Sequence, residues 1–309
     1  MRNALFMLLL LIVQLAVAQE CDKIVPVNVL NFSTHGVLQF DPERLHATVG
    51  GKPIPISVFH RTGGNRILVL VDISGSMEKN LRFTKAMFRE LLEHVPPGVS
   101  LAYGFFSEGV YLSRGFTREP EDLAKAVAHV DSLTWQHRGT ALYDALHEGL
   151  NLFQKVSPGD SILLITDGGE NRSRWNEGKV KREILESGIR VFAFMPPSII
   201  NAVQPEEIYG PARVSDFADE TGGVAFVLRT DWDLGDPKSA TATLGSLRQF
   251  WSEGIGGGYF VTFKLPESVK KPTKWKLGLD KSGDKHLKDA VVTYPWKLIP
   301  CSTIAAAVH

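Results

Sequence analysis

Three loops of the sequence carry oxygen-bearing side chains of the kind that hold a hard metal ion. The first is Asp72-Ile-Ser74-Gly-Ser76, in which a carboxylate and two hydroxyls stand at alternate positions, and Thr140 and Asp167 follow further along the chain. A cation such as Mg²⁺ prefers a near-octahedral shell of oxygens at about 2.1 Å, some of them from water. The sequence therefore predicts a site for Mg²⁺, or for Mn²⁺ or Ca²⁺, built from these five side chains.

The segments around these residues predict how they meet. Ile67 to Val71 and Ile162 to Ile165 are aliphatic blocks, typical of strands that are buried on both faces of a parallel sheet. Thr140 precedes a segment, 141 to 153, whose apolar residues have helix-like spacing. Because ligands of open α/β sheets bind beyond the carboxyl ends of the strands, we expect the three loops at one sheet edge.

In these residues the chain resembles a von Willebrand factor type A (VWA) domain, whose metal-ion-dependent adhesion site (MIDAS) has the pattern Asp-x-Ser-x-Ser, Thr, Asp. The resemblance implies that Ser74, Ser76 and Thr140 contact the metal and that Asp72 and Asp167 hold it directly or through water. It also implies that one coordination position is left for an Asp or Glu carboxylate of a protein partner. The alternative is that these residues serve only in turns and helix caps, where Asp, Ser and Thr are common.

The order of the segments predicts an α/β fold. Strands and helices alternate over 66–229, which indicates a doubly wound, mostly parallel, Rossmann-like sheet. Short β-like pieces occupy 19–60, a helix is expected over 240–252, and strands return over 255–301. We expect the two β-rich flanks to form a small second unit. The whole layout resembles the bacterial secreted VWFA-related family, although only the metal-site residues are specific.

Cationic and aromatic residues flank the predicted metal loops: Trp135, His137, Arg138, Arg172, Arg174 and Trp175. Arginine and tryptophan are enriched in interface hot spots, and arginine can grip a carboxylate with two hydrogen bonds, so this rim would suit an acidic partner. The alternative is that the tryptophans cover the core and the arginines pair with Glu170 or Glu177. Arg138 also departs from the family, which more often has a second glycine before Gly139, and this leaves the shape of that loop open.

The N-terminus predicts a secretory signal peptide over residues 1–18. A mostly aliphatic run extends through Val17, and Ala16-Val17-Ala18 supplies the small residues at which a signal peptidase cuts. A retained membrane anchor is the alternative, but Gln14 interrupts a run that is already shorter than the roughly 20 residues a spanning helix needs. We therefore expect a secreted or periplasmic protein with no transmembrane segment in the mature chain.

The chain has only two cysteines, Cys21 and Cys301. In an oxidising compartment the two can pair, which would bring the ends of the mature chain together. The loop-entropy model credits such a long loop with on the order of 5 kcal/mol, as an upper value. Two free thiols are the alternative, because connectivity cannot be read from sequence.

The composition argues against a nucleic-acid partner, because the 34 basic residues are matched by 34 acidic ones. Residues 255–301 hold nine lysines and four acids, which would suit an anionic envelope surface. We favour the simpler account that these lysines protect exposed β edges from aggregation.

The sequence predicts a binding module and no enzyme. It contains no HExxH, GxSxG or Walker-type motif. We predict an adhesion module that engages a partner through a metal-bridged carboxylate and whose 240–252 helix could move on binding. One alternative is an assembly subunit whose site is permanently filled by a neighbour's acid. The other is a Mg²⁺-dependent phosphoryl-transfer enzyme, which would need a base that the residues after Asp72 do not supply.

Overall fold

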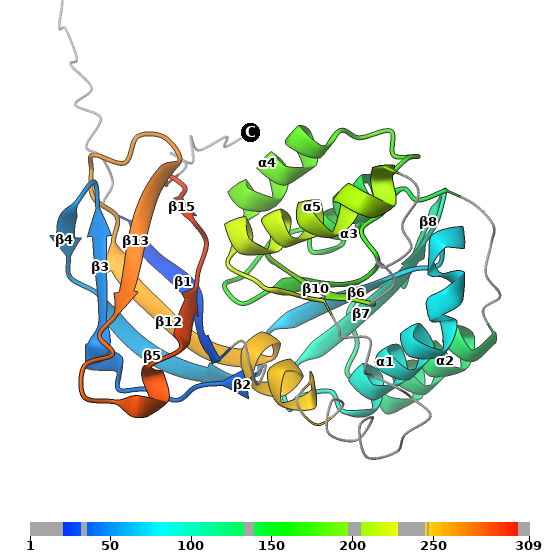
Figure 1. The fold of residues 1–309 in the computed structure, drawn as a ribbon, viewed down its shortest axis with the longest axis horizontal. Helices are drawn as coiled ribbons and strands as arrows, with labels where there is room; N and C mark the ends of the chain where they lie inside the picture. The colour runs from blue at the N-terminus through cyan, green and yellow to red at the C-terminus, as the bar shows by residue number, and fades with distance from the viewer. Residues whose placement is uncertain are drawn as a thin grey trace, which may run out of the picture.

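The chain forms a layered α/β unit and a two-sheet β unit that lie side by side (Figure 1). The computed structural model describes residues 21–31, 36–132, 139–196, 205–227, 245 and 247–301. In this part of the chain no helix is long and apolar enough to cross a membrane. The predicted signal peptide lies outside the described residues and stays a prediction.

A six-stranded sheet forms the centre of the α/β unit, in the order β11-β10-β9-β6-β7-β8. All neighbouring strands are parallel except β7 and β8. The strands are β6 (Arg66–Asp72), β7 (Ser100–Phe106), β8 (Val110–Leu112), β9 (Ser161–Ile165), β10 (Arg190–Met195) and β11 (Ala225–Val227). The predicted doubly wound, mostly parallel sheet is confirmed.

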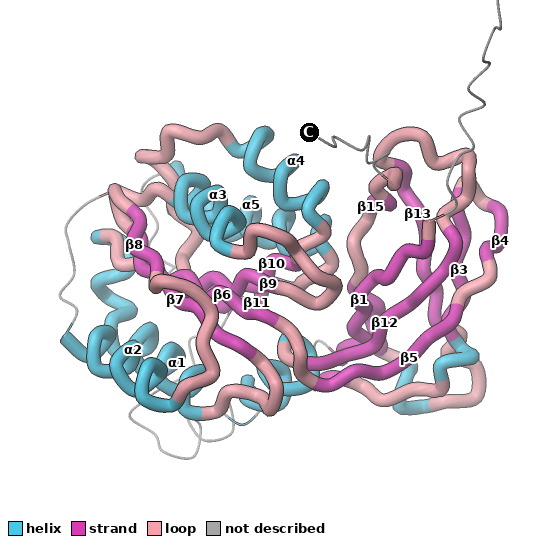
Figure 2. The backbone as a smooth tube through the Cα atoms, turned by 180° about the vertical axis from the view of Figure 1, so that it is seen from behind, coloured by secondary structure: helices cyan, strands magenta, loops and turns pink. Residues whose placement is uncertain are grey.

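Helices cover both faces of this sheet (Figure 2). One face packs against α1 (Leu81–Glu93) and α2 (Pro120–Ser132). The other packs against α3 (Leu142–Leu152), α4 (Glu177–Ser187) and α5 (Pro205–Thr221). In β6 the side chains of Val69 and Val71 enter the first core, whereas those of Leu68 and Leu70 enter the second. Burial on both faces explains why this strand is a continuous aliphatic block.

The β unit consists of two sheets whose facing side chains share one core. The first sheet has the order β14-β1-β12-β5, with β2 also paired to β1. Its strands are β1 (Asp22–Asn31), β2 (Gly36–Val37), β5 (Ser57–Thr62), β12 (Gly257–Lys264) and β14 (Ala290–Thr293). The second, β15-β13-β3-β4, contains β3 (Leu45–Val49), β4 (Lys52–Ile54), β13 (Thr273–Leu279) and β15 (Lys297–Leu298). Both flanks of the chain thus build one unit, as predicted.

A disulfide joins Cys21 to Cys301, with their Cα atoms 6.4 Å apart. It ties the residue before β1 to the end of the described chain, and so confirms the predicted pairing. It closes a loop of 280 residues that includes the whole α/β unit. Disulfides of this kind persist in oxidising compartments.

The helix expected over 240–252 differs from the prediction in its last turn. Residues 240–244 lie outside the described residues. The helical segment that the structure does describe ends in a π-helix, η4 (Phe250–Ile255). The Gly256 amide donates to the Trp251 carbonyl at 2.9 Å, five residues back. Phe250, Trp251 and Ile255 all enter the core beneath the sheet.

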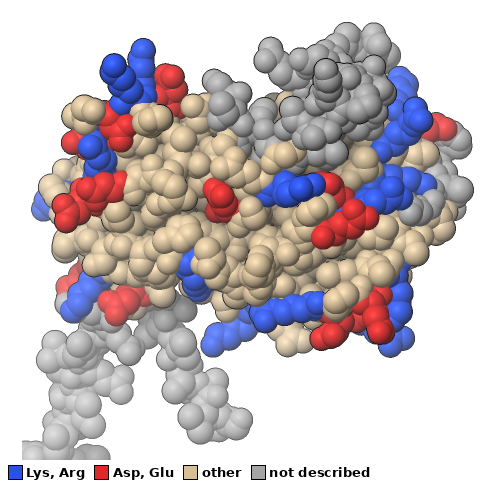
Figure 3. Space-filling model, turned by 90° about the horizontal axis from the view of Figure 1, so that it is seen from below, with Lys and Arg blue, Asp and Glu red and all other residues tan. Residues whose placement is uncertain are grey.

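Charged side chains of both signs are interspersed over the face of the molecule in Figure 3. Among the described residues visible there, basic and acidic groups alternate over short distances. A basic stripe, as nucleic-acid binders carry, would instead gather one sign.

Candidate metal centre

The sheet topology brings the three predicted metal loops to one edge. Strands β6 and β9 are parallel neighbours; β6 ends at Asp72, and Asp167 follows two residues after β9 ends. Thr140 lies two residues before α3. A Cβ atom placed on Gly169 would lie 3.2 Å from Asp167 Oδ1, 3.7 Å from Thr140 Oγ1 and 3.9 Å from Ser76 Oγ. Oxygens from all three loops therefore surround one point.

Asp72 is held rigidly at this point. Its carboxylate is fully buried and accepts hydrogen bonds from the Ser74 amide at 2.9 Å and from the Thr166 hydroxyl at 2.7 Å. The Ser74 and Ser76 hydroxyl oxygens lie 3.2 Å apart beside it. Burial and, secondarily, the negative charge of Asp167 raise the pKa of Asp72 to about 7, against the opposing effect of its hydrogen bonds. A divalent cation bound here would offset the negative charge of both neighbouring carboxylates.

The donor chemistry fits a hard cation better than a zinc cluster. No three His, Cys, Asp or Glu side chains gather anywhere in the described ranges. The predicted ligand set is two carboxylates and the hydroxyls of Ser74, Ser76 and Thr140. All of these are oxygen ligands, which Mg²⁺ and Ca²⁺ prefer.

The loop after Asp167 is fixed by a backbone contact with α5. Asp167 Oδ1 accepts the Gly169 amide at 3.0 Å, which closes a tight turn. Gly168 has φ +83°, and a Cβ there would lie 2.5 Å from the Gly210 carbonyl carbon; a Cβ on Gly210 would likewise overlap the Gly168 carbonyl. Only two glycines allow this approach, so Gly210 positions Asp167 although it touches no proposed ligand.

The Thr140 loop is hydrogen-bonded to the same turn. The Thr140 amide donates to Asn171 Oδ1 at 3.0 Å, and the amides of Asn171 and Arg172 both donate to the Thr140 carbonyl at 3.0 Å. The Ala141 amide donates to the Ser107 carbonyl at 2.7 Å, just after β7. Thr140 and Asp167 are therefore held in a fixed relation by the backbone.

The first turn of α3 completes this bracing. Ser173 Oγ accepts the amides of Tyr143 at 3.0 Å and Asp144 at 3.2 Å, and Glu170 Oε2 also accepts the Tyr143 amide. In return, Asp144 Oδ1 accepts the Arg174 amide at 2.9 Å. The loop thus satisfies helix N–H groups that have no partner within the helix.

Comparison with known proteins places the chain in a family. A family model described as VWA domain containing CoxE-like protein matches residues 44–209, more than half of the 309-residue chain. The chain belongs to this VWA family. VWA domains generally act as protein interaction modules and often bind a divalent metal at the MIDAS. No protein with a curated description matches the sequence.

Several solved structures are similar to this chain at low sequence identity. A von Willebrand factor type A protein from Catenulispora acidiphila is 12% identical, with 91% of this chain and 72% of that chain covered and a TM-score of 0.49. The conserved hypothetical protein BatB from Bacteroides thetaiotaomicron is 16% identical, with 60% and 98% covered and a TM-score of 0.43. Proximal thread matrix protein 1 from the mussel byssus, solved with a zinc-occupied MIDAS motif, is 16% identical, with 68% and 49% covered and a TM-score of 0.44.

The structure describes three of the six predicted rim residues and places them in two different regions. Trp135, His137 and Arg138 lie outside the described residues. Arg172 lies against Gly139, where a Cβ would overlap its side chain, and its Nε is 3.5 Å from Glu108 Oε1. Of the rim residues that the structure describes, Arg172 is the one whose contacts reach the metal loops.

Arg174 and Trp175 lie over α3 instead. Arg174 pairs with Asp144 at 3.1 Å and with Glu148 at 3.4 Å, so the predicted alternative partners, Glu170 and Glu177, are wrong for it. Trp175 packs on the His147 ring at 4.1 Å between centroids and against the helical core. The alternative prediction, that the tryptophans cover the core, is therefore correct for Trp175.

An exposed apolar pair lies beside the metal loops that the sequence analysis did not find. Ile208 and Tyr209, in the first turns of α5, are 50% and 60% exposed. They directly precede Gly210, which contacts the turn after Asp167. A Gly-Pro pair such as Gly210-Pro211 normally ends or interrupts a helix. The sequence therefore gave no reason to expect that α5 begins before this pair and includes Ile208 and Tyr209.

Proposed function

We propose that this VWA protein binds a protein partner through a divalent cation held by Asp72, Ser74, Ser76, Thr140 and Asp167, without chemical turnover. The observation that carries the proposal is the convergence of oxygens from three loops around Gly169, next to the buried Asp72. When bound, the cation would supply the positive charge that a partner's Asp or Glu carboxylate needs at this edge.

The chain's own residues prepare the site for such a partner. The hydrogen bonds to Asp72 fix its carboxylate, so little conformational entropy remains to be lost on binding. Ser74, Ser76 and Thr140 contribute neutral hydroxyls. With only two carboxylates, the protein matches the charge of a divalent cation without exceeding it, and an incoming acidic group meets no excess of negative charge.

The surface next to the site offers contacts for the partner residues around that acid. Ile208 and Tyr209 supply exposed apolar area, and the Arg172 side chain is also exposed. Tyrosine and arginine are among the residues that contribute most to protein interfaces. This surface supports recognition of a folded or peptidic partner in preference to an isolated carboxylate.

We further propose that the protein acts outside the cytoplasm, as a secreted or periplasmic protein with a cleaved signal peptide. The Cys21–Cys301 disulfide supports this location, because such bonds are rare in reducing compartments.

Calorimetric titration of the mature protein with Mg²⁺, Mn²⁺ and Ca²⁺ tests the metal site, and capture from envelope extracts with Mg²⁺ or EDTA tests the partner. We expect one-site cation uptake and metal-dependent capture of a partner, both lost in Asp72→Ala. Asp122→Ala, which removes an exposed carboxylate from α2, is the matched control and should behave as wild type. Absence of cation uptake by the folded wild type would refute the proposal. Loss of a stable oligomer on EDTA treatment would instead favour the assembly role.

A further inference from the structure

A second group of buried polar side chains lies where the β unit meets the VWA sheet, at the end opposite the metal loops. β6 begins at Arg66, four positions after β5 ends in the β unit, so the amino ends of the parallel strands face that unit. Arg190 is the first residue of β10, and Arg61 and Asn28 belong to β5 and β1. None of these belongs to the proposed metal site.

Asn28 and Arg61 share one row of the first β sheet. Arg61 pairs with Gly258 of β12 in the strand register, and Asn28 Oδ1 lies 3.0 Å from the position of a Cβ on Gly258. Residues opposite one another across strands project from the same face of the sheet. Two positions after Asn28, Leu30 packs into the core beneath the VWA sheet, which shows that this face is turned toward the α/β unit.

Several polar atoms of these side chains are buried without a hydrogen-bond partner. Arg190 is 1% exposed, and its Nε, Nη1 and Nη2 atoms make no hydrogen bond in the structure. Arg61 Nε and both polar atoms of the Asn28 amide are also buried and unpaired. The Arg190 guanidinium lies over the Phe192 ring at 4.9 Å, which holds it but satisfies none of its N–H groups. Buried polar atoms are rarely left in this condition.

No acid in the described part of the chain neutralises Arg190. The closest acid along the neighbouring strand is Asp160, whose backbone carbonyl accepts the Arg190 amide. Its carboxylate is already used by Arg66, 2.5 Å away, and by the Ser157 amide. Burial and the positive charge of Arg61 lower the pKa of Arg190 to about 9, so the guanidinium is still charged at neutral pH. An uncompensated buried cation is strongly unfavourable.

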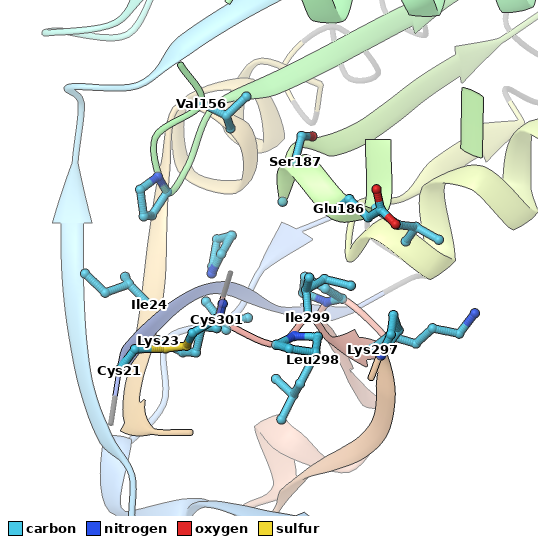
Figure 4. Close-up of a pocket in the computed structure, with 18 of the residues that line it drawn as sticks. Cys21, Lys23, Ile24, Val156, Glu186, Ser187, Lys297, Leu298, Ile299 and Cys301 are labelled. Atoms are coloured by element: carbon cyan, nitrogen blue, oxygen red, sulfur yellow. A yellow bond between two sulfur atoms is a disulfide. The ribbon is translucent and has the colours of Figure 1, made fainter. Parts of the chain in front are cut away.

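A cavity of about 750 Å³ lies at the junction of the two units (Figure 4). Val156 and Ser187 stand on the α/β side of the cavity, facing Ile24 and Ile299 of the β unit. Pro158, which also lines the cavity, accepts a hydrogen bond from Arg61. The cavity therefore comes within one residue of Arg61, on the side of the junction from which a small ion would enter.

We propose that Arg190, with Arg61 and Asn28, forms a binding site for a small inorganic anion between the VWA sheet and the β unit. The guanidinium N–H groups and the Asn28 amide would donate to the anion, and its charge would offset that of the two arginines. The near-complete burial of Arg190 leaves no room for a large organic anion, so chloride is the appropriate probe. By binding to both units, the anion would stabilise their junction.

Thermal unfolding of the mature protein in sodium chloride and in sodium gluconate at equal ionic strength tests this site. Because an anion that binds only the folded state stabilises it in proportion to ln(1 + [L]/Kd), we expect Tm to rise by about 3 °C when chloride exceeds its Kd tenfold. Gluconate should give no such rise. Arg190→Met should abolish the chloride effect, whereas Arg114→Met, which removes an exposed arginine outside both proposed sites, should keep it.

Two results would overturn the anion site. Arg190→Met being more stable than wild type in both salts would show that Arg190 is simply an unfavourable buried cation, since replacing such a charge by an apolar side chain is then stabilising. Should that variant fail to fold, wild-type crystals soaked in bromide decide the matter. An anomalous peak within hydrogen-bond distance of the Arg190 guanidinium supports the site, and ordered water alone contradicts it.

Discussion

The two edges of the VWA sheet have opposite chemistry. At the carboxyl edge, loops gather oxygen atoms: two carboxylates and three hydroxyls, with exposed residues such as Tyr209 nearby. At the amino edge, the Arg190 guanidinium and Nε of Arg61 are buried without acceptors where the sheet meets the β unit. On the two proposals above, one sheet would hold a cation at the edge that faces solvent and an anion at the edge that faces its own β unit. The difference teaches that the edge left open by the topology is available to bind a partner, whereas the covered edge serves to hold the two units of the chain together.

Removing the central carboxylate should have the largest effect on this contrast. Asp72→Ala eliminates the buried charge at the carboxyl edge, and we expect cation affinity to fall by at least about 100-fold. Isothermal titration with Mg²⁺ and Mn²⁺ measures this. The chloride dependence of Tm should persist in the same variant, because Arg190 lies at the other edge. Unchanged cation uptake would mean that the oxygens around Gly169 are not the metal ligands.

Breaking the disulfide should lower the stability of the protein, because the disulfide closes the β unit at the covered edge. It should leave cation binding at the open edge nearly unchanged. Cys301→Ser releases a loop of 280 residues, and we expect the free energy of unfolding to fall by up to about 5 kcal/mol. Denaturant melts of wild type and variant, each with and without reductant, measure the loss. Cation affinity should change less than twofold. A large drop in cation affinity would show that the two edges are coupled through the β unit.

The pKa of Asp72 predicts an unusual pH dependence for the metal-free protein. Its folded pKa of about 7 lies above the ordinary value of 3.8, so the folded state binds this proton more tightly than the unfolded state does. This group therefore favours folding below about pH 4, and its contribution is lost as the pH rises through 7. We expect wild type, relative to Asp72→Asn, to gain about 3 kcal/mol of stability between pH 8 and pH 5.

Chemical unfolding at several pH values in EDTA measures that difference. Saturating Mg²⁺ should reverse the trend, because protons compete with the cation and its affinity falls below about pH 7. Parallel pH profiles for wild type and Asp72→Asn would contradict the assignment of a buried, repelled carboxylate.

The smallest predicted effect is at the glycine contact behind the metal loops. Gly210→Ala places a methyl group against the Gly168 carbonyl, so the turn that carries Asp167 must shift. We expect a loss of about 1–2 kcal/mol of stability and roughly tenfold weaker cation binding. Gly115→Ala is the control, since a Cβ there meets nothing within 4 Å. Equal cation affinity in the two variants would remove Gly210 from the positioning of the site.

Much of this architecture could be predicted from local patterns along the chain. The aliphatic blocks before Asp72 and Asp167 identified two central strands because strands buried on both faces must be apolar throughout. The Asp-x-Ser-x-Ser spacing placed three oxygens on one loop. The interleaving of the two flanks into one β unit also follows the expected order of segments, with β1 lying between β12 and β14.

The remaining features depend on contacts between segments that are distant in sequence. The bond from Thr166 to Asp72, the packing of Gly210 on Gly168 and the isolation of Arg190 arise only when particular strands and helices become neighbours. Periodicity reports how a segment alternates between core and solvent, but it carries no information on which segment lies opposite. The residue types thus predicted a cation site at a strand edge, while the tertiary structure alone decided what braces those residues and what lies buried at the other end of the sheet.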